Sequence, residues 1–241
     1  MRPTRRQLLA ALAALPVSAV LPRLAWAASP KDVATWAGAI EAFEAQDNAS
    51  PPEPGRVLFI GSSSIRKWSS LADDMKPLPV INRGFGGSHL PHVTHYAPRI
   101  VAPYKPRAIV LYAGENDIAW GASAEDVLGE LDRFVAWVRE HVGGVPIWFL
   151  SVKPSPLRWD TWPEMDRANA LIRARLQEVP GVTYVDVASV LLDAQGLPDP
   201  SLFVSDKLHL NAAGYTRWTA VVRDALKPLF DRMNAEKSPA P

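Results

Sequence analysis

The sequence predicts an α/β fold, a three-layer α/β/α sandwich around a central, mostly parallel sheet of five strands. Five short runs are apolar almost throughout, which is typical of strands that are buried on both faces of a sheet. Segments with helical signals separate these runs, as the crossover connections of a parallel sheet require. The hydrophobic content of 48% and the charged content of 21% suit one ordinary globular domain. The five runs are RVLFIG (56–61), PVINRGF (79–85), RAIVLYAG (107–114), VPIWFLSV (145–152) and VTYVDVAS (182–189).

Residues 1–27 are expected to form an export signal that precedes this domain. The segment has a basic start, an apolar middle interrupted by prolines, and an A-x-A end at 25–27. The pair Arg5 and Arg6 resembles the twin-arginine signal of bacterial export, which predicts a periplasmic or secreted protein. A retained membrane anchor is the less favoured alternative, because the apolar stretch is short against the ~20 residues of a spanning helix. Residues 28–241 are then expected to form a single domain.

The predicted helices have recognisable faces and ends. Apolar residues at helical spacing predict a leading helix over 31–46, which DNASPPEPG then ends. Ser123 with Asp126, and Thr161 with Glu164, have the spacing of a capping box, in which each side chain satisfies a backbone N–H of the other residue. Two glycines after the first of these helices end it. Asn211 can cap the last helix, whose core face is Tyr215, Trp218, Val222, Leu226 and Leu229.

Four motifs are expected at the carboxyl ends of the strands or beside them, where α/β sheets bind ligands. They are GSSS at 61–64, GFGG at 84–87, GEND at 114–117 and SDKLHLN at 205–211. Each has an ordinary structural explanation by itself, since serine, glycine, asparagine and aspartate are the usual residues of turns and helix caps. Their joint occurrence is more informative than any one of them.

Together the motifs contain the groups that acyl transfer needs. A serine hydroxyl is a weak nucleophile unless a base accepts its proton, and an imidazole is the better base when a carboxylate fixes its tautomer. Asp206 and His209 lie three residues apart and can supply both groups on one turn. Backbone N–H groups at the serine turn and at Gly87, with the amide of Asn116, can then stabilise an oxyanion. The residue types alone do not decide among the three serines of GSSS.

These four motifs, in this order, resemble the four blocks of the SGNH (GDSL-type) esterase and lipase family. The resemblance implies a flavodoxin-like SGNH hydrolase fold without a cofactor or metal. It implies that Ser63, the second residue after Gly61, is the nucleophile, that His209 is the base and that Asp206 orients it. The Ser63 and Gly87 N–H groups and the Asn116 side chain would form the oxyanion hole. Serine replaces the family's common aspartate at position 62, similar to a subgroup with the sequence GSSSIRxW.

The function predicted from this resemblance is that of a serine esterase acting through an acyl-enzyme on small or carbohydrate-linked esters. Arg66, Arg83 and Trp159 are expected near the active face and are candidate substrate contacts, as are Trp68, Lys153 and Arg158. Stacking of arginine on tryptophan that only stabilises these loops is an equal alternative. Asp117 is expected to hold the GEND loop by accepting backbone hydrogen bonds, and Glu115 to line the site.

Other functions are disfavoured by what the sequence lacks. It contains no cysteine, which excludes disulfides, thiol catalysis and a lipid-anchoring cysteine. The formal net charge of +1 gives no electrostatic footprint for nucleic acid, and no stable membrane insertion is expected after signal cleavage. Three histidines, His89, His92 and His95, are a weak candidate for a metal cluster. A non-catalytic protein that binds carbohydrate or another small ligand on the same fold remains the alternative.

Overall fold

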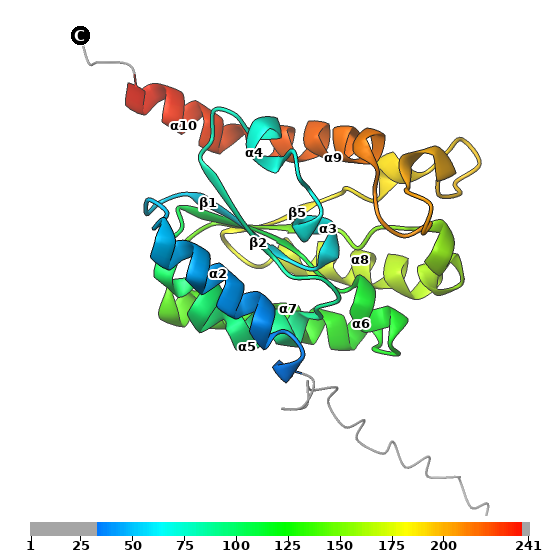
Figure 1. The fold of residues 1–241 in the computed structure, drawn as a ribbon. Coiled ribbons are helices and arrows are strands. Elements are labelled where there is room, and N and C mark those ends of the chain that lie inside the picture. The colour runs from blue at the N-terminus through cyan, green and yellow to red at the C-terminus, as the bar shows by residue number, and fades with distance from the viewer. Residues whose placement is uncertain (1–32, 238–241) are drawn as a thin grey trace, which may run out of the picture.

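The structure, a computed structural model, describes residues 33–237 and contains a parallel sheet covered by helices on both faces (Figure 1). The strands lie in the order β2-β1-β3-β4-β5, and each neighbouring pair is parallel. The predicted α/β/α sandwich is therefore confirmed, and each of the five apolar runs contains one strand. The strands are β1 (Val57–Gly61), β2 (Val80–Gly84), β3 (Ala108–Tyr112), β4 (Ile147–Leu150) and β5 (Val182–Val185).

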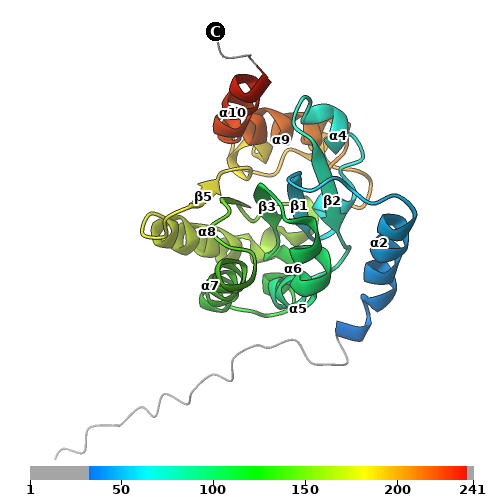
Figure 2. The ribbon, with the colours of Figure 1, turned by 90° about the vertical axis from the view of Figure 1, so that its left-hand side faces the viewer.

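Two helical layers enclose the sheet, and the view in Figure 2 separates them from it. One layer consists of α2 (Ala37–Ala49), α5 (Leu90–Ile100), α7 (Ala124–His141) and α8 (Trp162–Leu176). The other consists of α3 (Ser63–Arg66), α4 (Leu71–Asp74), α9 (Ala212–Ala225) and α10 (Lys227–Lys237). The short helix α6 (Glu115–Ala119) directly follows β3, and the 3-10 turns are η1 (Ala102–Tyr104), η2 (Pro156–Thr161), η3 (Ser189–Leu191) and η4 (Pro200–Leu202).

The sheet separates two hydrophobic cores, because successive strand residues point to opposite faces. In β1, Leu58 and Ile60 belong to the core beneath α2, α5, α7 and α8, whereas Val57 and Phe59 belong to the core beneath α4, α9 and α10. All four side chains are fully buried. Burial on both faces explains why the strand sequences are apolar throughout instead of alternating.

Two of the predicted helix caps are confirmed. At the start of α7, Ser123 Oγ accepts from the Asp126 N–H at 3.2 Å, and the Asp126 carboxylate accepts from the Ser123 N–H at 2.9 Å. This is the reciprocal arrangement that the spacing predicts. At the start of α9, Asn211 Oδ1 accepts from the Gly214 N–H at 3.1 Å. Each cap satisfies backbone donors that the first helical turn leaves without a partner.

The capping box predicted at Thr161 is wrong. The turn η2 runs directly into α8, so Thr161 has φ −96° and ψ −3° instead of the extended backbone of a capping residue. Its hydroxyl donates to the carbonyl of Arg158 at 2.9 Å. The Glu164 carboxylate instead accepts from the Ala124 N–H at 2.7 Å, at the start of the neighbouring helix α7. A tertiary contact has therefore replaced the local one.

The first and last predicted helices differ in extent from the observed ones. The leading helix was predicted over 31–46, whereas α2 begins at Ala37 and ends at Ala49. The last helix is divided at Leu226 into α9 and α10, although its predicted core residues are all buried. The predicted export signal, residues 1–27, lies outside the described residues. Within 33–237 no helix is long and apolar enough to cross a membrane.

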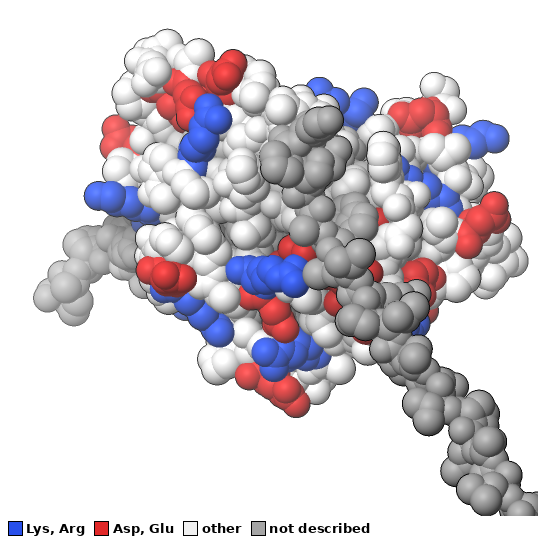
Figure 3. Space-filling model, turned by 90° about the horizontal axis from the view of Figure 1, so that it is seen from below, with Lys and Arg blue, Asp and Glu red and all other residues white. Residues whose placement is uncertain are grey.

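The face formed by α2, α5, α7 and α8 carries acidic and basic side chains next to one another (Figure 3). Several of them form ion pairs between neighbouring helices. Arg99 of α5 lies 2.6 Å from Glu44 of α2, and Arg175 of α8 lies 3.3 Å from Asp132 of α7. These ion pairs join neighbouring helices of the layer.

The register of the sheet brings the motif segments together at one edge. Gly61, the last residue of β1, lies opposite Gly84 of β2 and Tyr112 of β3. A Cβ atom at Gly61 would lie 1.9 Å from the Tyr112 carbonyl oxygen, so only glycine permits this close approach of the strands. The segments that follow these strands are GSSS, GFGG and GEND. They therefore start side by side, as parallel strands require.

Candidate active site

Ser63 occupies the turn between β1 and α3. Ser62 has extended backbone and precedes the helix, its N–H donates to the Tyr112 carbonyl at 3.0 Å, and Ser63 is the first helical residue. Position one of a helix leaves its N–H outside the intrahelical hydrogen bonds, so the Ser63 N–H is free to serve a ligand. Ser62 and Ser64 are buried, whereas Ser63 is partly exposed. Of the three serines, Ser63 is the accessible one.

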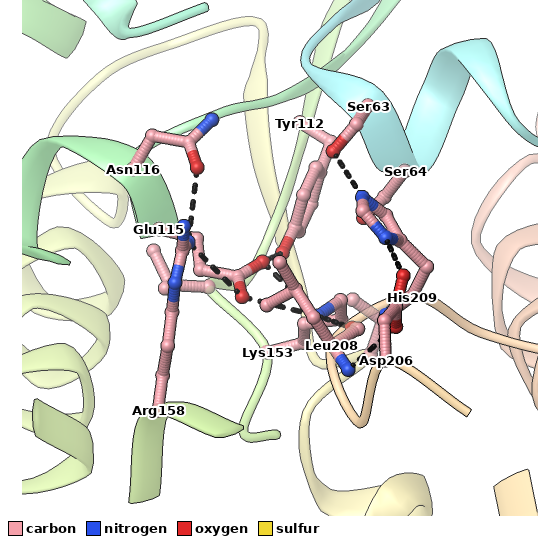
Figure 4. A network of polar contacts seen from close by, with 12 residues as sticks. Ser63, Ser64, Tyr112, Glu115, Asn116, Lys153, Arg158, Asp206, Leu208 and His209 are labelled. Atoms are coloured by element: carbon pink, nitrogen blue, oxygen red, sulfur yellow. Dashed lines mark hydrogen bonds and ion pairs between the residues drawn. The ribbon is translucent and has the colours of Figure 1, made fainter. Parts of the chain in front are cut away.

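The loop before α9 brings a histidine and an aspartate to this serine (Figure 4). His209 Nε2 lies 2.9 Å from Ser63 Oγ, and His209 Nδ1 lies 2.6 Å from Asp206 Oδ2. The second Asp206 oxygen accepts from the N–H groups of Leu208 and His209, both at 2.9 Å. A carboxylate at Nδ1 favours the tautomer with its proton there, which leaves Nε2 as an acceptor for the serine hydroxyl.

The environment of Asp206 keeps it ionised. Burial by itself raises the pKa of Asp206, but the hydrogen bonds from the His209 backbone and side chain and from the Leu208 N–H outweigh it. They hold the pKa well below its usual range, because each of them stabilises the charged form. The carboxylate therefore remains an acceptor for the imidazole at pH values well below the usual pKa of an aspartate.

The turn that carries this pair has an unusual backbone. Lys207, between Asp206 and His209, has φ +57°, in the left-handed region that favours glycine. Its conformation is held from two sides: the Lys207 N–H donates to Val204 O at 2.9 Å, and Lys207 O accepts from the Leu157 N–H at 2.9 Å. A strained residue persists when its surroundings determine its conformation, and such residues concentrate at functional sites.

Asn116 and Gly87 provide candidate donors on the side of Ser63 away from the histidine. Asn116 Nδ2 donates to the Ser88 carbonyl at 2.9 Å, and its Oδ1 accepts from Arg158 Nη1 at 2.9 Å. An amide NH2 has two hydrogens, so one remains for a ligand. Gly87 is exposed and has φ +78°, which glycine adopts without steric cost.

Asp117 joins the GEND motif to the loop that contains Gly87. Its Oδ1 accepts from the Leu90 N–H at 3.0 Å, at the start of α5. The predicted hydrogen bonding of Asp117 to backbone is therefore confirmed: Leu90 belongs to α5, and backbone N–H groups of Gly114 and Asp117 in the GEND motif also stabilise the carboxylate. Burial raises the pKa of Asp117 to about 7, against the opposing effect of the backbone N–H donors.

A buried ionic cluster lies beneath the serine and centres on Glu115, the first residue of α6 (Figure 4). Lys153 Nζ lies 3.1 Å from each oxygen of the Glu115 carboxylate, and the Tyr112 hydroxyl donates to the same carboxylate at 2.7 Å. Arg158 Nη1 lies 3.4 Å from it. The Lys153 and Glu115 side chains are 0% and 5% exposed, so substrate does not reach them.

The cluster was not anticipated from the sequence, which suggested Lys153 as a substrate contact and Glu115 as a lining residue. Both side chains are enclosed by protein instead. The sequence does contain one indication of the cluster: Lys153 immediately follows the apolar run VPIWFLSV. A lysine that continues a buried strand needs a buried acidic partner, and Glu115 follows the neighbouring strand β3.

Of the candidate substrate contacts Arg66, Arg83 and Trp159, two lie where a ligand can reach them. Trp68, a further candidate, is buried in the hydrophobic core. Arg66 is exposed at the end of α3, and Trp159 is partly exposed in η2, stacked on Trp162 with 6.0 Å between ring centroids. Arg83 is buried in β2 and pairs with Asp47 of α2. The structure does not bring Arg83 to the serine, because its guanidinium is committed to the contact between β2 and α2.

The histidines near Gly87 form an aromatic cluster. His92 packs against Trp36 at a tilt, with 4.0 Å between ring centroids, and its Nδ1 accepts from the His89 N–H at 3.1 Å. In the part of the chain that the structure describes, no three histidine, aspartate or glutamate side chains are placed to hold a metal ion. That finding includes His89, His92 and His95.

The sequence profile of the GDSL-like lipase/acylhydrolase family matches residues 59–217, from within β1 to within α9. The chain belongs to this family. It is an ester hydrolase of the SGNH, or GDSL, type, and the matched region contains all four motifs and the whole Ser63, His209 and Asp206 arrangement. No curated protein sequence matches the chain.

Solved structures of other proteins share the fold at low sequence identity. A protein from Streptococcus pneumoniae, provisionally described as a platelet activating factor, is 20% identical, with a TM-score of 0.70 over 80% of this chain and 94% of its own. A GDSL-like lipase from Bacteroides thetaiotaomicron is 20% identical, with a TM-score of 0.68 over 79% and 98%. A variant of an acetyl-xylooligosaccharide esterase from Geobacillus stearothermophilus is 15% identical, with a TM-score of 0.58 over 71% and 94%.

Proposed function

We propose that this hydrolase cleaves carboxylic esters by a two-step acyl-enzyme mechanism in which Ser63 is the nucleophile. The observation that carries the proposal is the chain of contacts from Ser63 Oγ to His209 Nε2 at 2.9 Å and from His209 Nδ1 to Asp206 at 2.6 Å. These distances suit transfer of the serine proton to the imidazole, while the carboxylate stabilises the imidazolium that forms.

In the first step Ser63 Oγ bonds to the carbonyl carbon of the ester, and its proton passes to His209 Nε2. The tetrahedral intermediate collapses when the C–O bond to the alcohol breaks, and the alcohol leaves with the proton from Nε2. In the second step water attacks the acyl-serine and gives its proton to Nε2. That proton returns to Ser63 Oγ as the carboxylic acid is released, so the enzyme is regenerated without any other reactant.

The oxyanion of both intermediates would lie between three donors. They are the N–H of Ser63, which the helix leaves free, the N–H of Gly87 and the second hydrogen of Asn116 Nδ2. The amide is already oriented by its bonds to Ser88 and Arg158, so no reorganisation is needed during the reaction.

For the substrate, we propose short acyl groups, in particular acetyl, on a carbohydrate. Trp120, at the end of α6, is 75% exposed, and its ring lies 5.7 Å from that of His89, beside the loop that carries Gly87. An exposed indole beside the loop that carries Gly87 offers a flat surface for a sugar ring. The acetyl-xylooligosaccharide esterase that shares the fold supports the same substrate class.

The test of the mechanism is the Ser63→Ala variant, with Ser69→Ala as a matched control because Ser69 is an exposed serine of the same segment. Hydrolysis of p-nitrophenyl acetate is expected to fall at least about 10³-fold in the first variant and to stay unchanged in the second. Wild-type protein that is no faster than Ser63→Ala would refute the esterase mechanism and favour a ligand-binding role.

The substrate class is tested by comparing kcat/KM for acetylated xylooligosaccharides, p-nitrophenyl acetate and p-nitrophenyl octanoate. We expect the order sugar acetate, then simple acetate, then octanoate. A preference for the octanoyl ester would contradict the proposal of short acyl groups while leaving the mechanism intact.

For the location, we propose export to the periplasm or the medium, directed by residues 1–27. The support is the sequence alone, with its paired arginines and its A-x-A end. Amino-terminal sequencing of protein recovered from a bacterial periplasmic fraction is expected to begin after Ala27. Recovery of uncleaved chain only from the cytoplasm would refute this.

A further inference from the structure

The catalytic turn has hydrogen bonds of its own, but most of it lies at the surface. His209 and Asp206 are on a loop that is partly exposed, and Lys207 between them has a left-handed backbone that costs about 1 kcal/mol or more for a residue with a side chain. Loops with few buried contacts sample other conformations easily. Contacts from elsewhere in the fold therefore add to the turn's own hydrogen bonds in keeping the base within reach of Ser63.

That support comes from the segment that follows β4. Lys153 Nζ donates to the Leu208 carbonyl at 2.7 Å, and the Leu157 N–H donates to the Lys207 carbonyl at 2.9 Å. Two consecutive carbonyl groups of the turn are thus bound from one neighbouring segment. The Lys153 ammonium also lies 5.7 Å from the centre of the Phe203 ring, near the start of the same loop.

The position of the ammonium is fixed in turn by the sheet and by α6. The Glu115 carboxylate forms ion pairs with Lys153 and Arg158 and accepts a hydrogen bond from the Tyr112 hydroxyl. Arg158 also donates to Asn116 Oδ1 at 2.9 Å. The cluster therefore contacts both halves of the site: the Leu208 carbonyl on the histidine side, and the Asn116 amide on the oxyanion side. Figure 4 shows it between the two.

We propose that Lys153 is a positioning residue for ester hydrolysis, whose buried ammonium ties Glu115 to the Leu208 carbonyl and so holds the Asp206–His209 turn in register with Ser63 and Asn116. This inference rests on the proposed mechanism. Lys153 does not touch the reacting atoms, because its side chain has no exposed surface. It acts through the backbone of the turn.

The electrostatics suit such a role. Burial lowers the pKa of Lys153, and the neighbouring Glu115 carboxylate opposes that effect. Burial and the Glu115 charge together raise the pKa of Tyr112 far above its usual value, so the phenol keeps its proton and remains a donor. The donors of the cluster thus converge on one acceptor, and a dry environment strengthens each of these bonds.

The experiment compares wild type with Lys153→Met, the double variant Glu115→Gln/Lys153→Met, and Lys76→Met as a matched control at an exposed lysine. Methionine keeps the length and apolar stem of lysine without the ammonium. Lys153→Met alone leaves a buried carboxylate short of a partner and is expected to lower thermal stability, whereas the double variant removes both charges and is expected to recover part of it.

With p-nitrophenyl acetate, kcat is expected to fall about 10- to 100-fold in both Lys153 variants, with KM nearly unchanged, because a displaced base slows chemistry more than binding. Lys76→Met is expected to match wild type. Recovery of kcat in the double variant, in parallel with its stability, would overturn the proposal, since it would show that Lys153 contributes only to folding.

A second readout does not depend on turnover. The proton between His209 Nδ1 and Asp206 is expected to give a low-field proton resonance in the wild type, assigned by its absence in His209→Asn. We expect the resonance to be lost or broadened in both Lys153 variants. An unchanged resonance would refute the positioning role, whereas a wild type that shows the resonance but no esterase activity would refute the proposed function instead.

Discussion

Two acid–base pairs lie within the same site and differ in almost every physical respect. Asp206 and His209 have side chains that are 44% and 16% exposed, whereas those of Glu115 and Lys153 are 5% and 0% exposed. The exposed pair belongs to a loop, whereas in the buried pair Glu115 begins α6 shortly after β3 and Lys153 lies shortly after β4. Substrate must reach a base that exchanges protons with it, whereas a positioning contact is strongest away from water.

The comparison also explains how strain is tolerated. The exposed pair requires a left-handed residue, Lys207, in its turn, while the buried pair supplies the contact at the adjacent Leu208 carbonyl. Strain of this kind is stable when neighbouring structure over-determines the conformation. The half of the site that we propose to be reactive is therefore the less regular half, and in our proposal its geometry depends on the more regular one.

The largest expected effect is that disrupting the exposed pair lowers activity, whereas disrupting the buried pair lowers stability. Asp206→Asn should lower kcat by about 10³- to 10⁴-fold, because the imidazole loses the acceptor that fixes its tautomer. Glu115→Gln should instead lower the free energy of unfolding by about 3 kcal/mol, because Lys153 is left buried without its carboxylate. Activity assays and urea unfolding of both variants measure this contrast.

A matched control for the second variant is Glu125→Gln, since Glu125 forms an exposed pair with Arg167. Exposed pairs contribute little to stability, so this change should be nearly neutral. The comparison would fail if Asp206→Asn destabilised the protein as strongly as Glu115→Gln, or if Glu125→Gln did so.

A smaller effect is expected on the oxyanion side. Asn116→Ala removes a donor to the oxyanion and the acceptor for Arg158, and should lower kcat about 10²- to 10³-fold. Steady-state kinetics with p-nitrophenyl acetate measure this. An Arg158→Lys variant tests the role of Arg158. If Arg158 only orients the amide, this variant should lower kcat less than Asn116→Ala does. The reverse order would give Arg158 a direct role.

The smallest effect concerns pH and stability at Asp117, which is buried without a cationic partner among its described contacts. A raised pKa means that the folded state holds its proton more tightly than the unfolded chain. Stability should therefore decrease as pH rises from about 4, the usual pKa of an aspartate, to about 7. Asp117→Asn cannot titrate and should show a melting temperature that depends less on pH across this window. The melting temperatures of both proteins are measured at pH 4.5 and at pH 8. The same change in melting temperature between these two pH values in wild type and in Asp117→Asn would refute this.

The sequence was sufficient for the layers, the five strands and the caps at Ser123 and Asn211. These features depend on local periodicity and on short-range hydrogen bonds, which neighbouring residues determine. It was also sufficient to nominate Ser63, Asp206 and His209, because the motifs resemble those of a known family. It misassigned Arg83 and the cap at Thr161, since Asp47 and Ala124, the partners that decide both cases, lie far away in the chain.

What the sequence alone determined is therefore which residues form the sheet and which motifs follow its strands. Only the tertiary structure decided that Lys153 is buried against Glu115 and the Leu208 carbonyl instead of facing substrate. The physical reason is that burial of a charge depends on partners supplied by three separate segments, 108–115, 153–158 and 203–210. Their meeting is a property of packing, which no local pattern in the chain encodes.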